Sequence, residues 1–186
     1  MKGFRRAVAS DAAQLVTLVR SAYRGSASRH SWSSEADLVA GERIDKGQVL
    51  GLIERPGSML LVLDEGDGLV ACCQLEDRGA GLAYLGTLAV QPEAQGRGVG
   101  RRVVADAERR VVDEFAACAL ELTVLAQQQA LILWYERLGF RRTGETRPFP
   151  ADPRYARPKR DDLYFVVLRK KLDEQTRLTG GSPMVN

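Results

Sequence analysis

Apolar and polar positions along the chain follow two periods, which separate the expected strands from the expected helices. Residues 58–77 and 81–90 contain short apolar runs joined by glycine-rich turns, a pattern typical of antiparallel strands. After residue 98 the apolar positions repeat every three or four residues, as on one face of a helix: Val99, Val103, Val104, Ala107 and Val111. We therefore expect strands and amphipathic helices in one layered domain.

The predicted elements run in a defined order. They are a strand over 4–8, a helix capped by Ser10 and ending near Gly25, a short helix with the capping pair Ser34 and Asp37 running through Leu38, a hairpin over 58–77 turning at Glu65–Gly68, a strand over 81–90, a helix over 99–116, a strand over 119–126, a helix over 130–138 and strands over 140–145 and 162–172. This order predicts an α+β fold with a single mixed, mostly antiparallel sheet of about six to seven strands, flanked by about four helices. We expect residues 1–172 to form one domain and residues 173–186 a polar, flexible tail.

Composition narrows the class of protein. The chain has 186 residues, 45% of them hydrophobic, which suits a single domain with its own core. The net charge of +3 is spread along the chain, so no basic tract favours binding to nucleic acid. No apolar run reaches the roughly 20 residues of a membrane span, and no secretory leader is evident. The sequence predicts a soluble, cytoplasmic protein without nucleic-acid or membrane partners.

The cysteines give no sign of a disulfide framework or a metal site. Cys72, Cys73 and Cys118 are odd in number, and the chain has a single histidine, His30. We expect the three thiols to be buried in the core, and we expect no metal site.

Residues 86–104, GTLAVQPEAQGRGVGRRVV, place three glycines between an expected strand and an expected helix. The first turn of a helix offers unpaired amides and the positive end of the helix dipole, so this loop is suited to an anion. A dinucleotide loop is excluded because the sixth position counted from Gly96 is Arg101, and a Walker loop is excluded because Arg101 and Arg102 follow Gly100. A simple tight turn between strand and helix stays open as an alternative.

Two motifs in this order resemble a known superfamily. Residues 95–100, QGRGVG, fit the Q/R-x-x-G-x-G/A signature, and residues 134–140, WYERLGF, resemble its F/L-Y-E-K-L-G-F segment. The chain thus resembles the GNAT superfamily of acetyl-CoA-dependent N-acetyltransferases over most of residues 4–172. With residues 144–150, GETRPFP, it is similar to a bacterial branch of that superfamily.

The resemblance implies a site for acetyl-CoA. The loop amides would bind the pyrophosphate, and the preceding strand end would bind the pantetheine arm and the thioester carbonyl. Gln128 stands where many relatives carry an asparagine that contacts this arm, so that contact is an open question. The implied cofactor-binding residues are Leu88, Ala89, Val90, Gln95, Gly96, Arg97, Gly98, Val99, Gly100, Arg101 and Gln128.

The resemblance also implies catalytic residues. Tyr135 matches the tyrosine that lies near the thioester sulfur and would act as general acid. Glu121, two residues before the position of a catalytic glutamate in some relatives, is the expected general base, with Glu76 in reserve. The alternatives are an ordinary aromatic for Tyr135 and a salt-bridged strand glutamate for Glu121.

Segments outside these motifs are expected to select the acceptor. They are Tyr23–Trp32, with His30 and Trp32, and the loop Arg147–Arg160. The arginines of that loop are suited to a carboxylate or phosphate, or are simply solvated and neutralised by neighbouring aspartates.

The function implied is transfer of acetyl from acetyl-CoA to a primary amine of a small molecule or peptide, by direct attack and without a covalent enzyme intermediate. A protein of this kind is expected to be a monomer or homodimer. The alternative is a non-catalytic acyl-CoA sensor or partner-binding module on the same fold.

Overall fold

The computed structural model describes residues 3–24, 35–150 and 152–172 of the chain. Seven strands form one sheet, in the order β1 (Gly3–Arg6), β3 (Ser58–Asp64), β4 (Leu69–Asp77), β5 (Leu82–Val90), β6 (Ala119–Leu125), β9 (Tyr164–Lys171) and β7 (Arg141–Pro148). Neighbouring strands pair antiparallel except β5 and β6, which are parallel. A separate short ribbon pairs β2 (Val39–Ala40) with β8 (Arg157–Pro158). These observations confirm the predicted α+β fold with one mixed sheet.

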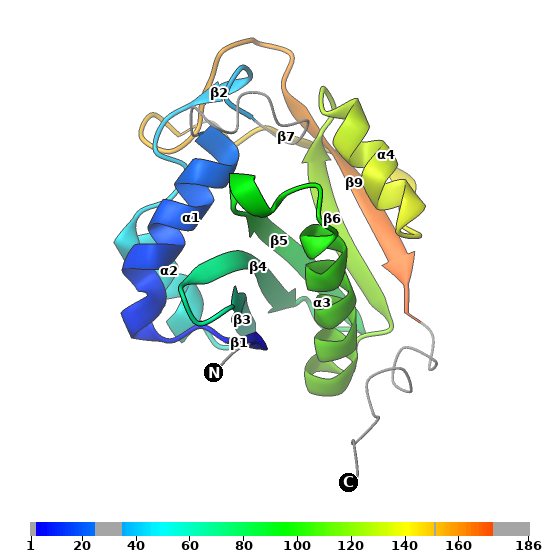
Figure 1. Ribbon diagram of the computed structural model, residues 1–186. Helices are drawn as coiled ribbons and strands as arrows, with labels where there is room; N and C mark the ends of the chain where they lie inside the picture. The colour runs from blue at the N-terminus through cyan, green and yellow to red at the C-terminus, as the bar shows by residue number, and fades with distance from the viewer. Residues whose placement is uncertain (1–2, 25–34, 151, 173–186) are drawn as a thin grey trace, which may run out of the picture.

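Two layers of helices cover the sheet, as Figure 1 shows. One face carries α1 (Ala12–Arg24) and α2 (Lys46–Glu54), whose apolar side chains pack with Leu60, Val62 and Ala89. The other face carries α3 (Val99–Phe115) and α4 (Gln129–Arg137). These helices pack with strand side chains that point to the opposite face of the sheet, such as Leu61 and Leu85. The period of two in the strands thus supplies a hydrophobic surface to each helical layer.

The two parallel strands separate after a short paired stretch. Only Leu82–Tyr84 of β5 pair with Ala119–Glu121 of β6. Beyond that point β5 continues to Val90 with β4 as its partner, and β6 continues to Leu125 with β9 as its partner. The edges of β5 and β6 that face each other therefore diverge toward the C-terminal ends of the strands (Figure 1).

The first half of the chain differs from the sequence prediction at two helices. A 3-10 turn at Ala9–Asp11 precedes α1, and the Asp11 carboxylate, not Ser10, accepts the Val8 amide proton at 2.8 Å. The predicted helix through Leu38 is wrong, because residues 36–38 form a turn, and Ser34 lies outside the described residues. The second helix is α2, which begins with a reciprocal capping box between Asp45 and Gln48.

The cysteine prediction is confirmed at two of three positions. Cys72 and Cys73 are buried, but Cys118 is exposed. Cys118 lies just before β6, outside the sheet interior, and its thiol contacts the Gly81 carbonyl oxygen at 3.4 Å. Within the described ranges no helix is both long and apolar enough to cross a membrane. The predicted tail at 173–186 lies outside the described residues.

Candidate active site

A cavity of about 890 Å³ opens where β5 and β6 separate. Its walls include residues 84–90 of β5 and 122–125 of β6, and beyond Tyr84 the facing edges of the two strands are unpaired. A strand edge carries amide and carbonyl groups that need partners, so this wedge is suited to an extended ligand that contains amide bonds. Helix α1, the start of α3 and helix α4 contribute the remaining walls near these edges.

The glycine loop forms one end of this cavity. Gly96 and Gly98 adopt φ values of +73° and +78°, in the left-handed region that favours glycine. A Cβ atom built on either residue would meet no heavy atom within 4 Å, so open space lies beside the backbone. Gly98 is the N-cap of α3, and among the described residues no side chain caps this helix start. Amides at the start of α3 are thus available to an anion, as the sequence predicts.

Gly100 has a different physical role from its two neighbours. A Cβ atom on Gly100 would lie 3.3 Å from the Trp134 ring, which is tighter than an ordinary contact. The residue allows the first turn of α3 to pack against α4, and its packing role was not predicted from the sequence. Gln95 also serves the framework, because its Nε2 donates to the Val90 carbonyl oxygen at 3.1 Å.

The end of β5 contains a bulge at the cavity wall. The step from Cys72 to Gln74 in β4 is matched by the step from Ala89 to Gly86 in β5, so β5 carries one extra residue. Within the bulge Thr87 has a φ of +44°, an uncommon value for a residue with a Cβ atom. Bulges redirect backbone groups, and this one lies where the strand faces the cavity.

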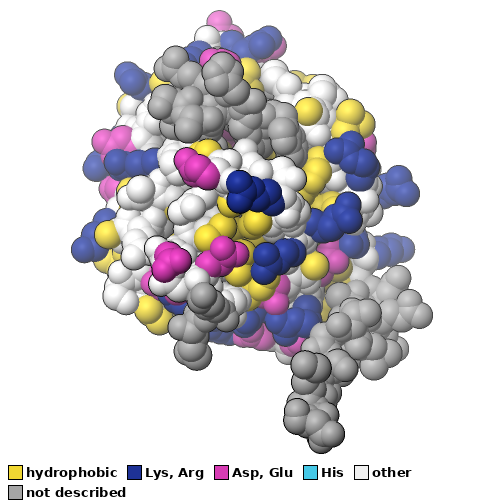
Figure 2. All heavy atoms as spheres, viewed as in Figure 1, with side chains coloured by type: hydrophobic (Ala, Val, Ile, Leu, Met, Phe, Trp, Pro, Cys, Tyr) yellow, Lys and Arg dark blue, Asp and Glu magenta, His cyan; other side chains and the backbone are white. Residues whose placement is uncertain are grey.

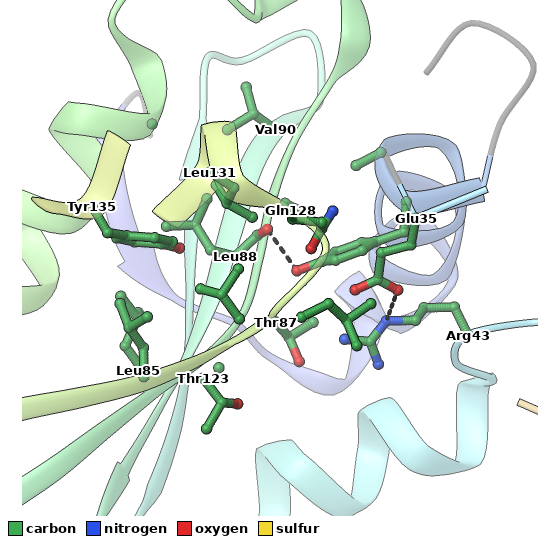
Figure 3. A pocket seen from close by; sticks show the side chains of 18 of the residues that line it. Glu35, Arg43, Leu85, Thr87, Leu88, Val90, Thr123, Gln128, Leu131 and Tyr135 are labelled. Atoms are coloured by element: carbon green, nitrogen blue, oxygen red, sulfur yellow. Dashed lines mark hydrogen bonds and ion pairs between the residues drawn. The ribbon is translucent and has the colours of Figure 1, made fainter. Parts of the chain in front are cut away.

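Tyr135 lies on α4 with its hydroxyl pointing into the cavity, toward Leu88 and Leu131 in Figure 3. Its ring is held edge to face by Trp134, at 4.7 Å between centroids, and by Phe140, at 5.6 Å. Burial, together with the nearby Tyr23, Cys73 and Tyr84, raises the pKa of Tyr135 well above its ordinary value. The phenol is therefore protonated at neutral pH and can serve as a proton donor.

Glu121 is buried in β6 but is not among the residues that line the cavity. Its carboxylate accepts hydrogen bonds from Arg147 and, at 2.6 Å, from Arg169. Burial raises the pKa of Glu121, but these two guanidinium groups outweigh that effect and leave the pKa below its ordinary value. A carboxylate held in this way is a weak base, and the contacts match the salt-bridged alternative. The reserve candidate Glu76 pairs with Arg78 at 3.2 Å and is also absent from the cavity walls.

The structure brings most predicted cofactor-binding residues to the same cavity. Those that line it are Leu88, Ala89, Val90, Gln95, Gly96, Gly98, Val99, Gly100, Arg101 and Gln128. Arg97 is exposed on the loop and does not line it. On the face shown in Figure 2, Lys and Arg side chains are frequent over α3 and α4; Arg101, Arg102 and Arg137 are exposed basic residues of these helices.

A polar cluster lies at the other end of the cavity, and the sequence prediction includes only Arg24 of it, within the expected acceptor segment Tyr23–Trp32. Tyr23, Arg24, Glu35 and Arg43 line the wall here. Figure 3 shows Glu35 facing the Arg43 guanidinium. The Glu35 carboxylate lies 3.3 Å from the Arg24 guanidinium and 3.8 Å from Nε of Arg43. No spacing rule joins residues 24, 35 and 43, which come from different segments, so no local signal in the sequence identifies this cluster.

Most arginines of the predicted acceptor loop form ion pairs with acidic side chains of the protein. Arg147 pairs with Glu121, Arg154 lies 3.4 Å from Asp45, and Arg160 pairs with Asp162. Only Arg160 pairs with a neighbouring aspartate, as the neutralised alternative expects, whereas the partners of Arg147 and Arg154 come from other segments. The loop does supply Phe149, Asp152 and Tyr155 to the cavity wall. His30 and Trp32 lie outside the described residues.

Solved structures of other proteins share this fold. The crystal structure of smu.2055 from Streptococcus mutans UA159 superposes with a TM-score of 0.69 at 19% identity, covering 93% of this chain and 100% of that one. The ribosomal-protein-S18-alanine N-acetyltransferase from Escherichia coli gives 0.66 at 14% identity, covering 100% and 99%. The putative acetyltransferase yncA from Salmonella typhimurium, solved with its cofactor acetyl-CoA, gives 0.63 at 19% identity, covering 98% of each chain.

Identities this low show a common fold alone. No curated protein sequence matches the chain. A family model for the acetyltransferase (GNAT) family matches residues 15–140, a span that contains the glycine loop, the diverging strands and Tyr135. The chain belongs to the acetyltransferase (GNAT) family.

Proposed function

We propose that the protein transfers the acetyl group of acetyl-CoA to a primary amine of a small molecule or peptide. The observation that carries this proposal is the continuity of one cavity. It joins the uncapped glycine start of α3, the bulged end of β5 and the hydroxyl of Tyr135. An anionic group, an amide-containing arm and a reactive thioester could thus each meet a suitable partner along one path.

The residues present fit coenzyme A. Open space beside Gly96 and Gly98 lets a pyrophosphate approach the amides at the start of α3, and Arg101 adds positive charge. The free edges of β5 and β6 offer amide and carbonyl groups to the pantetheine arm. An amide at the end of β5 would donate to the thioester carbonyl as negative charge develops on its oxygen.

The transfer needs one proton donor and one route for a proton to leave. The amine lone pair attacks the carbonyl carbon, so a carbon–nitrogen bond forms while the carbon–sulfur bond breaks. Tyr135 gives its proton to the departing thiolate, and the tyrosinate is then reprotonated from water. The amine loses a proton to water in the cavity. We do not assign Glu121 as the base, since its carboxylate is held by two arginines away from the cavity wall.

The experiment that tests the proposal measures release of free coenzyme A from acetyl-CoA, with amines of several classes offered as acceptors. Polyamines, amino acids, aromatic alkylamines and short peptides cover the chemistry, and the acetylated product is identified by mass. An acetyltransferase gives a product one acetyl group heavier with equal release of coenzyme A. The non-catalytic sensor instead predicts tight binding of acetyl-CoA and no acetylated amine. Cytoplasmic location, a monomeric or homodimeric state, and the absence of nucleic-acid and membrane partners stay predictions from the sequence.

A further inference from the structure

We propose that Arg43 binds a carboxylate of the acceptor, so that the acceptors are small amino acids or amino-acid-like compounds and not simple amines. This inference rests on the proposed function, because it names the acceptor class of the same cavity. It rests on three observations about the Arg43 guanidinium: where it lies, which neighbours hold it, and which of its N–H groups face the cavity.

The Arg43 guanidinium is fixed in place by two neighbours. It stacks over the Tyr23 ring, 4.6 Å from the centroid, and its Nε lies 3.8 Å from the Glu35 carboxylate. Figure 3 shows the two terminal nitrogens turned away from Glu35, into the space bounded by Thr87. The side chain is 31% exposed although it lies within the cavity wall. A stacked guanidinium with its terminal N–H groups directed into a cavity is suited to a bidentate carboxylate.

The backbone under Arg43 is also held in a costly conformation. Arg43 has a φ of +70°, a region that favours glycine or asparagine over arginine. The turn is pressed against a neighbouring loop, because a Cβ atom on Gly41 would lie 2.7 Å from the Arg154 carbonyl oxygen. The Arg43 amide donates to the Tyr155 carbonyl oxygen at 3.2 Å. Strain of this kind is typical of positions where a particular side chain must be presented.

The cluster around Arg43 has more donors than acceptors. Two guanidinium groups, Arg24 and Arg43, share the single carboxylate of Glu35. Nε of each arginine is buried and lacks a hydrogen-bond partner within the described residues. The other acid of this wall, Asp152, directs one carboxylate oxygen to the amides of Arg154 and Tyr155. A carboxylate bound at the terminal nitrogens of Arg43 would balance the second positive charge.

Part of the cavity wall is apolar and suits an apolar portion of the acceptor. Phe149 and Phe165 lie with ring centroids 5.8 Å apart, and both line the cavity together with Leu125. Polyamines, which carry several positive charges and no carboxylate, would meet Arg24 and Arg43 at this end. The charge therefore favours an acceptor with one amine and one carboxylate on an apolar frame.

The test compares acceptors that differ only at the carboxylate. L-Phenylalanine, L-leucine and L-methionine are each assayed against their primary amides and against phenethylamine, 3-methylbutylamine and 3-(methylthio)propylamine. The amide is the critical comparison, because the amino group of an amino-acid amide has a lower pKa than the amino group of the free amino acid. A preference for the acid over the amide therefore cannot come from the fraction of free amine.

For at least one acid we expect kcat/KM to be higher than for its amide by about tenfold or more. We expect this difference to arise from a lower KM for the acid and not from a higher kcat. Arg43→Gln should reduce this ratio to near one and leave the KM for acetyl-CoA unchanged, while Arg43→Lys should retain part of it. Arg55→Gln is the matched control, since Arg55 is exposed at the end of α2, and it should keep the full ratio. Circular dichroism and thermal unfolding confirm that each variant is folded.

Equal rates for acids and amides in the unmodified protein would overturn the inference and leave acetyl transfer standing. Survival of the preference in folded Arg43→Gln would likewise remove Arg43 from acceptor binding. If no amine of any class is acetylated, the proposed function fails as well, so the two failures are distinguishable.

Discussion

The Tyr23 hydroxyl donates a hydrogen bond of 2.8 Å to the Leu88 carbonyl oxygen, joining α1 to the bulged end of β5 (Figure 3). The same ring carries the Arg43 guanidinium on its face. One tyrosine thus connects the strand end that we assign to the cofactor with the arginine that we assign to the acceptor.

Tyr23→Phe removes this hydrogen bond and keeps the ring under Arg43. We expect the free energy of unfolding to fall by about 1 kcal/mol, the typical net value of one such bond. The bulge should also be less well fixed, so that kcat/KM falls several-fold while the preference for acids over amides is retained. Chemical denaturation and the coenzyme A release assay measure the two effects. Tyr164→Phe, at an exposed position of β9, is the control; equal behaviour of the two variants would mean that the Tyr23 bond has no role.

Gly98→Asp tests the anion site at the start of α3. A carboxylate there would repel a phosphate from the helix amides, so we expect the Kd for coenzyme A to rise about tenfold or more. The backbone cost is matched in Gly79→Asp, because Gly79 has a φ of +75° and open space but lies in the turn before β5. Titration calorimetry should show weaker binding in the first variant alone. Undiminished affinity in Gly98→Asp would show that the loop does not hold the pyrophosphate.

Gly100→Ala tests the close contact between α3 and α4. The added methyl group would lie 3.3 Å from the Trp134 ring, so the ring and its neighbour Tyr135 must shift. Overpacking typically costs about 1–3 kcal/mol, and alanine regains up to about 1 kcal/mol over glycine within a helix, so we expect a net loss of about 0.5–2 kcal/mol together with a lower kcat. Thermal unfolding and steady-state kinetics give both values. A variant with unchanged stability and rate would contradict the packing role assigned to Gly100.

Glu121→Gln separates a structural role from a catalytic one. Arg147 and Arg169 would lose their shared carboxylate, and we expect unfolding to become easier by roughly 1–3 kcal/mol, with kcat within about threefold of the original. A fall in kcat of a hundredfold without loss of stability would make Glu121 the base after all. Glu54→Gln, at an exposed residue of α2, provides the matched control.

The stability contributed by Glu121 should depend on pH in one direction. Its pKa is lower in the folded protein than its ordinary value, so the folded state favours the charged carboxylate. The contribution is therefore fully present above the unfolded pKa of about 4.3 and is lost as the pH falls through the lower folded pKa. Denaturation curves of the unmodified protein and Glu121→Gln should converge below about pH 4. A difference that stays constant from pH 7 into this range would argue against the ion pairs as its source.

Features that follow from local sequence could be predicted, and those that depend on tertiary contacts could not. The left-handed glycines Gly96 and Gly98 and the start of α3 follow from adjacent residues, so the glycine loop between β5 and α3 was predictable. Helix α2 was missed because Gly47 and Gly51 interrupt its helical pattern, although the Asp45 capping box marks its start.

At the acceptor end the sequence predicted two segments, Tyr23–Trp32 and Arg147–Arg160, but not the position of Arg43 or Glu35. Arg43 acquires its position from a strained turn pressed against residues 154 and 155, and Glu35 reaches it from a separate segment. The bulge at Thr87 arises from pairing between β4 and β5, which the apolar run GLAYLGTLAV does not reveal. Glu121 was placed on the correct strand, but its two arginine partners come from β7 and β9.

The central claim, acetyl transfer within this cavity with Tyr135 as proton donor, is tested most directly by the turnover of Tyr135→Phe. We expect the unmodified protein to release coenzyme A and acetylate an amine, and Tyr135→Phe to lower kcat about a hundredfold with the KM for acetyl-CoA within about twofold. Because the pKa of Tyr135 is raised, the rate of the unmodified protein should show no loss of the acid up to about pH 10. Unchanged turnover in Tyr135→Phe, or acetyl-CoA binding without acetylation of any amine, would contradict the account.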